Sequence, residues 1–346
     1  MFTTNYQLPT TNYQLPTTNY QNSVHQEKNI PSSWHGNLDI VYALRNGKTQ
    51  PIRDRVQAPL KVQRPFYPEG EICHTAILHT AGGIVGGDRL SINLQLQPRS
   101  QALVTTTAAT KIYRSNGLPA RQTVEMQIDA GACLEWLPQE TIVFNEANYR
   151  QDLRVELAPG ASWLGWEITR FGRSARGERF LQGEWRSHTE VWQQGQPLWI
   201  DRQWLPGEEA VLNSPHDLAR HSIVASLTWI GCEVSPELVV QARELWGQGS
   251  GVGSRESGVG KESRRAGKQG SRGSISSHQS LATQLPTTNY QLPTTNHGVT
   301  RLPQGLLCRY RGSSSIEVRH WFTSVWQLLR LSLLDRSSCL PRVWQQ

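Results

Sequence analysis

The chain has 346 residues and a formal net charge of +7, a length that fits two ordinary domains or one large β fold. The segment 248–300 carries six Lys/Arg and two Glu, so it supplies +4 of this charge and leaves +3 for the rest of the chain. Because a nucleic-acid-binding fold concentrates basic residues on its folded surface, this distribution argues against nucleic acid as the partner.

The five cysteines are odd in number, far apart, and form no Cys-x-x-Cys pair. This pattern argues against a disulfide framework or a structural zinc site and favours buried thiols in a reducing compartment. No apolar run reaches the roughly 20 residues of a membrane helix, and the first residues lack the charged and apolar regions of a secretory signal. We therefore expect a cytoplasmic protein that is not inserted in a membrane.

The chain opens on a seven-residue repeat, Thr-Thr-Asn-Tyr-Gln-Leu-Pro. Complete copies span Thr3–Pro9 and Thr10–Pro16, and another copy returns at Thr287–Pro293. A proline in every copy is incompatible with a coiled coil, and one Leu and one Tyr per copy cannot form a core. The sequence therefore predicts a disordered tail over 1–32.

Globular composition begins at Ser33. The run Leu38–Leu44 predicts a strand, and the following Asn46-Gly47 is typical of a hairpin turn. Two further extended segments are expected at Pro59–Pro65 and Ile72–His79. The first part of the folded chain is therefore predicted to be β.

The sharpest local signal is a loop with four glycines in six residues, Gly82, Gly83, Gly86 and Gly87. Glycine reaches positive φ without steric cost and lets another backbone or a ligand approach closely. No Lys-Ser or Lys-Thr closes the loop, and the alternation in Leu90–Gln97 predicts a strand where a phosphate-binding loop needs a helix. We interpret the loop as a structural double turn, with a polar site around Asp88 as the alternative.

A weaker repeat follows, in which a strand, a tight turn and a second strand recur at offsets of 32 and 29 residues. The aligned turns span 94–100, 126–132 and 155–161, and the second strands are expected over 102–107, 133–137 and 162–168. Units of this length cannot bury their apolar faces alone, so they stack on their neighbours. We predict an all-β dominated fold of stacked β-hairpins in a layered or super-helical arrangement.

Two helices are expected towards the C-terminal end. One begins at Ser235-Pro236 and ends at Gly247, and the other begins at Ser314, with Glu317 completing a capping box. The Gly/Ser-rich segment between them predicts a solvated insert over 248–300. The folded domain is therefore expected to span 33–247 and to be completed by residues 301–346.

The sequence has no pattern typical of a catalytic centre. Gly-x-Ser-x-Gly and His-Glu-x-x-His are absent, and no Ser, His and Asp stand together in an activating context. We therefore expect a non-catalytic protein. The residues alone indicate a β protein that serves as a binding scaffold, and a basic nucleic-acid-binding or other protein-interaction β scaffold stays open as the alternative.

Several long runs, in the same order, resemble the UreD family of urease accessory proteins, called UreH in some bacteria. These runs are Gly82–Leu90, Thr105–Ser115, Leu134–Thr141, Phe171–Glu178 and Pro341–Trp344. The resemblance covers about residues 33–247 and 301–346 and leaves out the repeat-containing tail and the insert.

The resemblance implies an all-β, super-helical fold with two helices and a role in inserting nickel into apo-urease. It implies a scaffold that binds apo-urease and the helical accessory protein UreF, and through UreF the GTPase UreG, in a dimeric assembly. GTP hydrolysis would belong to UreG. This chain would hold no tightly bound cofactor, and Ni²⁺ would only be in transit.

A protein that passes Ni²⁺ on must hold it weakly, because a closed cage would trap the metal. The oxygen-bearing residues of the family-like runs that could line a nickel path are Asp88, Thr106, Thr110, Glu140 and Glu178. Weaker metal-site candidates near the glycine loop are Cys73, His74 and His79. Each also has an ordinary structural interpretation, since Asp88 can cap the turn and a single His is more often part of the hydrogen-bonded structure than a ligand.

Overall fold

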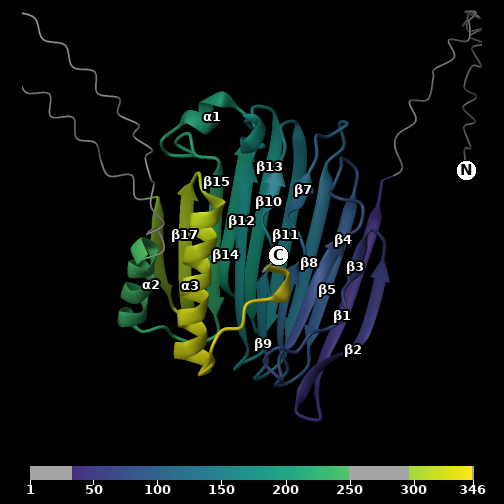
Figure 1. Cartoon of the computed structure of the whole chain (residues 1–346), viewed down its shortest axis with the longest axis vertical. Coiled ribbons are helices and arrows are strands. Elements are labelled where there is room, and N and C mark those ends of the chain that lie inside the picture. The colour runs from purple at the N-terminus through teal and green to yellow at the C-terminus, as the bar shows by residue number, and fades with distance from the viewer. Residues whose placement is uncertain (1–32, 249–295, 345–346) are drawn as a thin grey trace, which may run out of the picture. The chain divides into compact units, whose positions relative to one another are not determined.

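The structure is a computed structural model that describes residues 33–248 and 296–344. The predicted disordered tail over 1–32 lies outside the described residues, as does most of the predicted insert over 248–300. The described chain forms two β-sheets and a layer of helices (Figure 1). None of its helices combines the length and the apolar character needed to cross a membrane.

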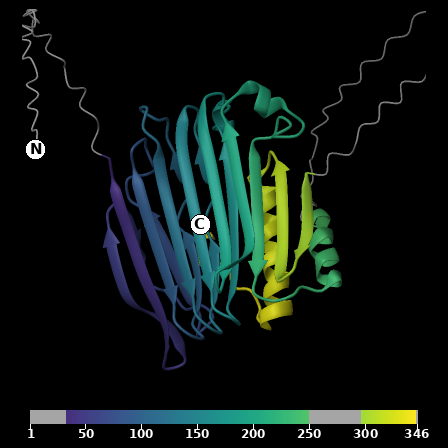
Figure 2. The same ribbon diagram turned by 180° about the vertical axis from the view of Figure 1, so that it is seen from behind.

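Sheet A has seven strands and is seen from the side opposite the helices in Figure 2. In spatial order its strands are β14 (Gln196–Pro206), β13 (Gly183–Gln193), β11 (Ala147–Leu157), β8 (Ala120–Ile128), β5 (Arg89–Leu96), β1 (His35–Arg45) and β2 (Lys48–Gln57). The five strands from β13 to β1 are mutually parallel. The hairpin expected at Asn46-Gly47 is confirmed, since β1 and β2 pair antiparallel around it.

Sheet B has ten strands and lies between sheet A and the helices. Its main path runs through β16 (His297–Leu302), β17 (Gly305–Gly312), β15 (Ile223–Ile230), β12 (Ser162–Phe171), β9 (Cys133–Leu137), β6 (Gln101–Thr106), β4 (Cys73–His79) and β3 (Leu60–Val62). Two short strands extend the end of β12, namely β10 (Thr141–Val143) and β7 (Thr110–Ile112).

The sequence repeat is confirmed as the organising unit of the fold. Leu94, Met126 and Val155 lie side by side in parallel strands, as the alignment predicts. The turn of each unit contains a left-handed residue, with φ of 63° at Arg99, 69° at Gly131 and 76° at Gly160. The chain then crosses to sheet B, so the two strands of a unit pair with their counterparts in neighbouring units. The units are therefore stacked β-arches in a layered, solenoid-like arrangement, where the sequence suggested hairpins.

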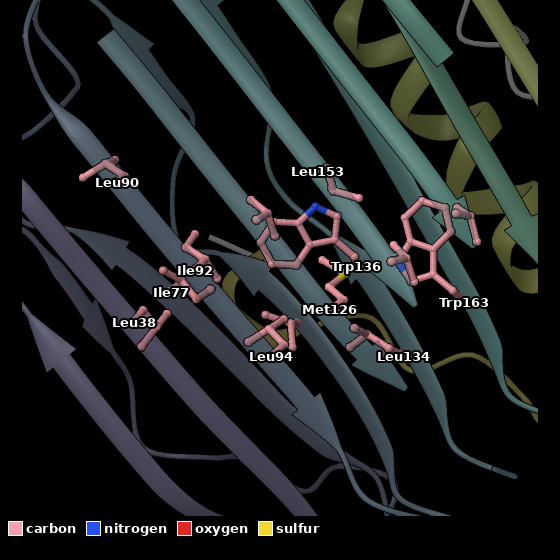
Figure 3. Packing of buried hydrophobic residues seen from close by; sticks show 14 of the residues in the cluster. Leu38, Ile77, Leu90, Ile92, Leu94, Met126, Leu134, Trp136, Leu153 and Trp163 are labelled. Atoms are coloured by element: carbon pink, nitrogen blue, oxygen red, sulfur yellow. The ribbon is translucent and has the colours of Figure 1, made fainter. Parts of the chain in front are cut away.

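The main core lies between the two sheets. Figure 3 shows Leu94 and Met126 of sheet A packed towards Leu134, Trp136 and Trp163 of sheet B. Along β5 every second residue is buried, which is the pattern of a strand with one face in a core. Full burial of one such apolar side chain stabilises the fold by about 1.5–3 kcal/mol, so the arches depend on this shared interior.

A second core lies between sheet B and two helices, α2 (Pro236–Gln248) and α3 (Ser315–Leu334). Both expected helices are confirmed, and the Ser314 hydroxyl accepts a hydrogen bond from the backbone N–H of Glu317 at 3.2 Å, as the capping signal predicts. Three short elements were not predicted, namely α1 (Glu209–Asn213), η1 (Ser174–Arg176) and η2 (Arg342–Trp344).

Strand β16 begins inside the predicted insert. His297 to Thr300 pair antiparallel with β17, so they belong to the edge of sheet B. The ring of His297 stacks on Trp246 of α2 with the ring centroids 4.5 Å apart. The domain therefore resumes by His297, before the boundary expected at residue 300.

Helix α3 is fixed to sheet B by a buried ion network. Arg330 is 1% exposed; its Nε donates to Glu135 Oε1 of β9 at 3.0 Å and its Nη2 to Glu69 Oε2 at 2.7 Å. Trp326 also donates to Glu135, at 2.9 Å. Burial opposes the charge of Glu69, but hydrogen bonds from His74 and Arg330 outweigh it and lower the pKa of Glu69. The helical layer is thereby tied to β9 of sheet B and to the turn that precedes β4.

Replacing Arg330 by Met should remove the shared cation and leave the buried Glu135 carboxylate with the Trp326 N–H alone, while the half-buried Glu69 keeps its contact with His74. We expect the free energy of unfolding to fall by about 3–5 kcal/mol, the usual cost of breaking a buried pair on one side. Urea denaturation measures this loss. Arg179→Met, which removes an exposed pair with Glu209, is the matched control and should cost less than about 1 kcal/mol. Equal losses in the two variants would contradict an anchoring role for the network.

Candidate functional site

A cavity of about 370 Å³ lies between the sheets, in the interior of the arches. Its lining includes the inward faces of β5, β8 and β11 from sheet A and of β9, β12 and β15 from sheet B. At one end it is bounded by the glycine loop at 82–84, by the segment 107–111 that leads into β7, and by Pro138, Gln139 and Thr141 before and at the start of β10. Gly82, Ala108 and Lys111 are exposed there, so the cavity reaches the surface at the glycine loop.

The cavity is polar along one row of sheet A. Gln122 of β8, Gln151 of β11 and Ser187 of β13 occupy matching positions of neighbouring parallel strands, with their side chains on the inward face. The Gln122 amide donates to Gln151 Oε1 at 3.2 Å, and the Tyr149 hydroxyl reaches the same oxygen at 3.4 Å. Polar groups buried in a core need such partners, and the Gln151 side chain serves both Gln122 and Tyr149.

Glu167 brings a carboxylate into this interior from sheet B. It lies on β12, and the hydroxyl of Ser187 on the opposite sheet donates to its Oε2 at 2.8 Å. Thr169 contacts its other oxygen at 3.4 Å. The side chain therefore spans the space between the sheets.

The surroundings of Glu167 disfavour its charge. Burial raises the pKa of this carboxyl from 4.5 to about 7, and the nearby carboxylate of Asp201 acts in the same direction. The hydrogen bonds from Ser187 and Thr169 and the charge of Arg309, whose guanidinium is bound to Asp201 at 2.7 Å, lower this pKa but only partly oppose the effect of burial. Glu167 was not predicted from the sequence, although the sequence contains one sign of a polar interior. Gln122 and Gln151 are 29 residues apart, the offset of the repeat itself, and both interrupt an apolar face.

A glycine shapes the floor of the cavity beside Glu167. A Cβ atom at Gly165 would collide with the ring of Trp163, which lies against the strand at this point. Trp163 and Gly165 both line the cavity. Because Gly165 has no side chain, the Trp163 indole can lie against the strand and the cavity stays open.

The predicted glycine loop forms the rim of the cavity. Gly82 and Gly83 line it, and a Cβ at Gly83, where φ is 153°, would collide with Tyr113 and with the Lys111 carbonyl. Gly86 and Gly87 pack against the 115–118 turn. Asp88 is fully buried, and its two carboxylate oxygens accept backbone N–H groups of Trp34 at 2.8 Å and Val85 at 2.9 Å. Asp88 therefore holds the turn and does not line the cavity.

Three other predicted residues, His79, Thr106 and Thr110, line the cavity close to this rim. Both ring nitrogens of His79 are buried and have no hydrogen-bond partner among the residues that the structure describes. Burial lowers the pKa of His79, and the Asp88 carboxylate only partly opposes this effect. A neutral imidazole with a free lone pair is the form that can coordinate a metal ion.

The remaining predicted residues lie apart from the cavity. Glu140 borders a separate hollow beside the first turn of α3, close to the rim. Glu178 accepts hydrogen bonds from Arg173 Nε at 2.7 Å and from the backbone of Asn145 at 3.1 Å. Cys73 is buried with a raised pKa because of its burial, and His74 bonds Glu69 at 2.6 Å.

The arrangement suits weak, successive contacts with a cation better than a closed metal cage. Across 33–248 and 296–344, no three His, Cys, Asp or Glu side chains come together in a way that could hold a metal ion. The cavity instead offers hydroxyl and amide oxygens, one imidazole and one carboxylate. Oxygen ligands of this kind bind divalent ions weakly and exchange them readily.

The pKa of Glu167 predicts a pH-dependent stability. Because the folded pKa of about 7 exceeds the usual 4.5, the folded state holds the proton more tightly, so stability falls as pH rises through this window. In Glu167→Gln the side chain at this position does not ionise, so this contribution to the pH dependence of stability is absent. We expect wild type to lose about 2–3 kcal/mol relative to this variant between about pH 5 and pH 8, measured by urea denaturation in a chelating buffer. Parallel pH profiles for the two proteins would contradict this assignment.

Comparison with known proteins identifies the family of this chain. The sequence model described as "UreD urease accessory protein" matches residues 35–345. The chain is 60% identical over 318 residues to a Nostoc punctiforme protein named urease accessory protein UreD, covering 91% of this chain and 98% of the relative. A protein of the same name from Acaryochloris marina is 52% identical over 313 residues, covering 90% and 96%. The chain belongs to the UreD family of urease accessory proteins.

Proposed function

We propose that this protein is a non-catalytic scaffold for inserting nickel into apo-urease in the cytoplasm. It binds apo-urease and UreF, and through UreF it works with UreG, which hydrolyses GTP, in a dimeric assembly. Family membership supports the urease-related role. The proposed role in nickel insertion is supported by the polar cavity between the sheets, which reaches the surface at the glycine loop.

The ligand chemistry of the cavity fits a cargo ion. Ni²⁺ enters past the hydroxyls of Thr106 and Thr110 and the imidazole of His79, and continues towards Glu167 in the interior. Glu140 lies beside the entrance, whereas Asp88 and Glu178 support the path by holding neighbouring loops in place. Each contact is weak, so the ion can leave again, and Ni²⁺ is a substrate of the assembly and not a resident cofactor.

The alternative of a nucleic-acid-binding scaffold has less support. The outward face of sheet A carries many arginines, and several of them pair with carboxylates, as in Arg150 with Asp152 and Arg186 with Glu184. This pairing reduces the positive charge that the face could offer to phosphates. An electrophoretic shift assay at physiological salt should show no complex, and a stable complex would favour the alternative.

Blocking the cavity should stop nickel delivery without unfolding the protein. Gln122→Phe places a ring in the cavity, whereas Thr123→Phe places the same ring on the outward face of the same strand. In a reconstituted urease activation assay with the partner proteins, we expect the first variant to lower activation at least tenfold and the second to keep it near wild type.

The same two variants should capture apo-urease and UreF equally well in pull-down experiments. Full activation by Gln122→Phe, with the ring shown to occupy the cavity, would exclude this interior as the route of the ion. Equal loss in both variants would point to a general effect on folding, which their urea denaturation curves would reveal.

A further inference from the structure

Four arginines form a row across the outward face of sheet A, the face turned to the viewer in Figure 2. Arg89 of β5 is in register with Arg121 of β8, Arg121 with Arg150 of β11, and Arg150 with Arg186 of β13. All four are exposed. Neighbouring strands lie about 4.8 Å apart, so this arginine row extends for about 14 Å across the sheet. The first three arginines are 32 and 29 residues apart, so the row is a product of the stacked arches.

The carboxylates beside the arginine row are too few to neutralise it. Asp152 is shared by Arg121 at 2.9 Å and Arg150 at 2.8 Å, and Glu184 binds Arg186 at 2.7 Å. The arginine at the start of β5 forms no ion pair with any residue that the structure describes. Four guanidinium groups therefore face two carboxylates, and the row keeps an excess of positive charge.

The stability of the sheet does not explain this row. Like charges directly opposite each other on neighbouring strands destabilise a sheet. Glu184 raises the pKa of Arg186, and the positive charge of Arg150 acts in the opposite direction, as expected for two adjacent cations. The ion pairs of the row are formed by arginines whose side chains are about half exposed, and exposed pairs contribute little to stability. The row is therefore better explained by binding.

An exposed tryptophan lies at each end of the arginine row. Trp204 of β14 is in register with Arg186, is 60% exposed, and has its ring centre 5.5 Å from the guanidinium carbon of Arg186. Trp34, which is 48% exposed, precedes β1, and its carbonyl accepts the backbone N–H of Arg89 at 2.8 Å. Tryptophan and arginine are enriched among the residues that dominate the binding energy of protein interfaces. The composition of the patch therefore fits a protein partner.

We propose that the arginine row is a docking surface for an acidic segment of a partner protein, whose Asp and Glu side chains pair with the guanidinium groups. Arginine binds carboxylates through two parallel hydrogen bonds, and an incoming carboxylate has only weak exposed pairs to compete with. This docking role goes beyond the proposed function, because it requires no contact with nickel.

A nucleic acid fits the same surface less well. Its phosphates continue along the strand and need positive charge over the whole length of contact. The positive excess ends with the row, because the next rows combine Arg154 with Glu156 and Glu190. A short acidic segment can end where the row ends.

Fluorescence anisotropy tests the docking surface with a labelled peptide of six consecutive glutamates and the full-length protein. We expect wild type to bind this peptide, less tightly as salt is added, and not to bind a peptide of six glutamines. Arg89→Gln/Arg121→Gln removes two cations from the row. We expect its affinity for the glutamate peptide to be about tenfold lower than that of wild type.

Arg53→Gln/Arg55→Gln is the matched control, because it removes two exposed arginines from β2 on the same outward face but outside the row. Its net charge changes equally, so it measures non-specific attraction, and its affinity should stay within about threefold of wild type. Arg89→Gln alone, which breaks no ion pair among the described residues, should also weaken binding and replaces the double variant if urea denaturation shows that one to be unstable.

Three results would overturn the proposal. The first is the absence of glutamate-peptide binding by wild type, and the second is an equal loss of affinity in the two double variants. The third is tighter binding of a single-stranded DNA with six phosphates that is lost in Arg89→Gln/Arg121→Gln, because it would assign the row to nucleic acid.

The outcome is separable from that of the proposed function. If wild type supports urease activation but does not bind the glutamate peptide, the docking role fails and the scaffold function stands. If the peptide binds at the arginine row but the protein has no effect on urease activation, the docking role stands and the proposed function fails.

Discussion

The β-arch is the constraint on which the rest of the structure depends. Each unit sends its first strand into sheet A and its second into sheet B, so equivalent residues of successive units form rows across both sheets. A row of apolar residues, such as Leu94, Met126 and Val155, closes the core. A row of polar residues, such as Gln122, Gln151 and Ser187, leaves a polar interior instead. The cavity is thus a consequence of the repeat and not an addition to it.

The helical layer stabilises this arrangement from the other side of sheet B. Arg330 joins α3 to Glu69 and Glu135, and the C-terminal residues return to the sheet, where Trp344 stacks on Trp166 with centroids 5.2 Å apart. The indole N–H of Trp344 also donates to Thr105 at 3.0 Å. Because Trp166 contacts the cavity as well, the helical layer supports the wall of the candidate site. Because the candidate site has few ligands, it depends on a rigid wall to hold each of them in position.

Much of this fold could be predicted from the sequence, because its signals are local. The offset of the repeat, the turn at Asn46-Gly47 and the cap at Ser314 each depend on residues close together in the chain, and each is confirmed. The pairing within a unit could not be predicted, since an arch and a hairpin share the same alternation of apolar residues. Strand β16 could not be predicted for a different reason. Its six residues follow directly on low-complexity sequence and show little alternation of apolar and polar residues.

The candidate site was predictable only in part. Thr106 and His79 lie near a motif that stands out in the sequence, whereas Glu167 stands in an ordinary strand and acquires its character from Ser187 and Asp201, which lie on two other strands of the opposite sheet. Only the three-dimensional contacts distinguish such a carboxylate from a surface acid.

Under the proposed function, nickel reaches urease only when this chain is present, although the chain performs no reaction itself. The most direct measurement is the nickel content of purified urease after incubation of apo-urease with Ni²⁺, GTP, UreF and UreG, with and without this protein. We predict that nickel is incorporated and activity appears only when this protein is present. Equal nickel incorporation in its absence would contradict the account.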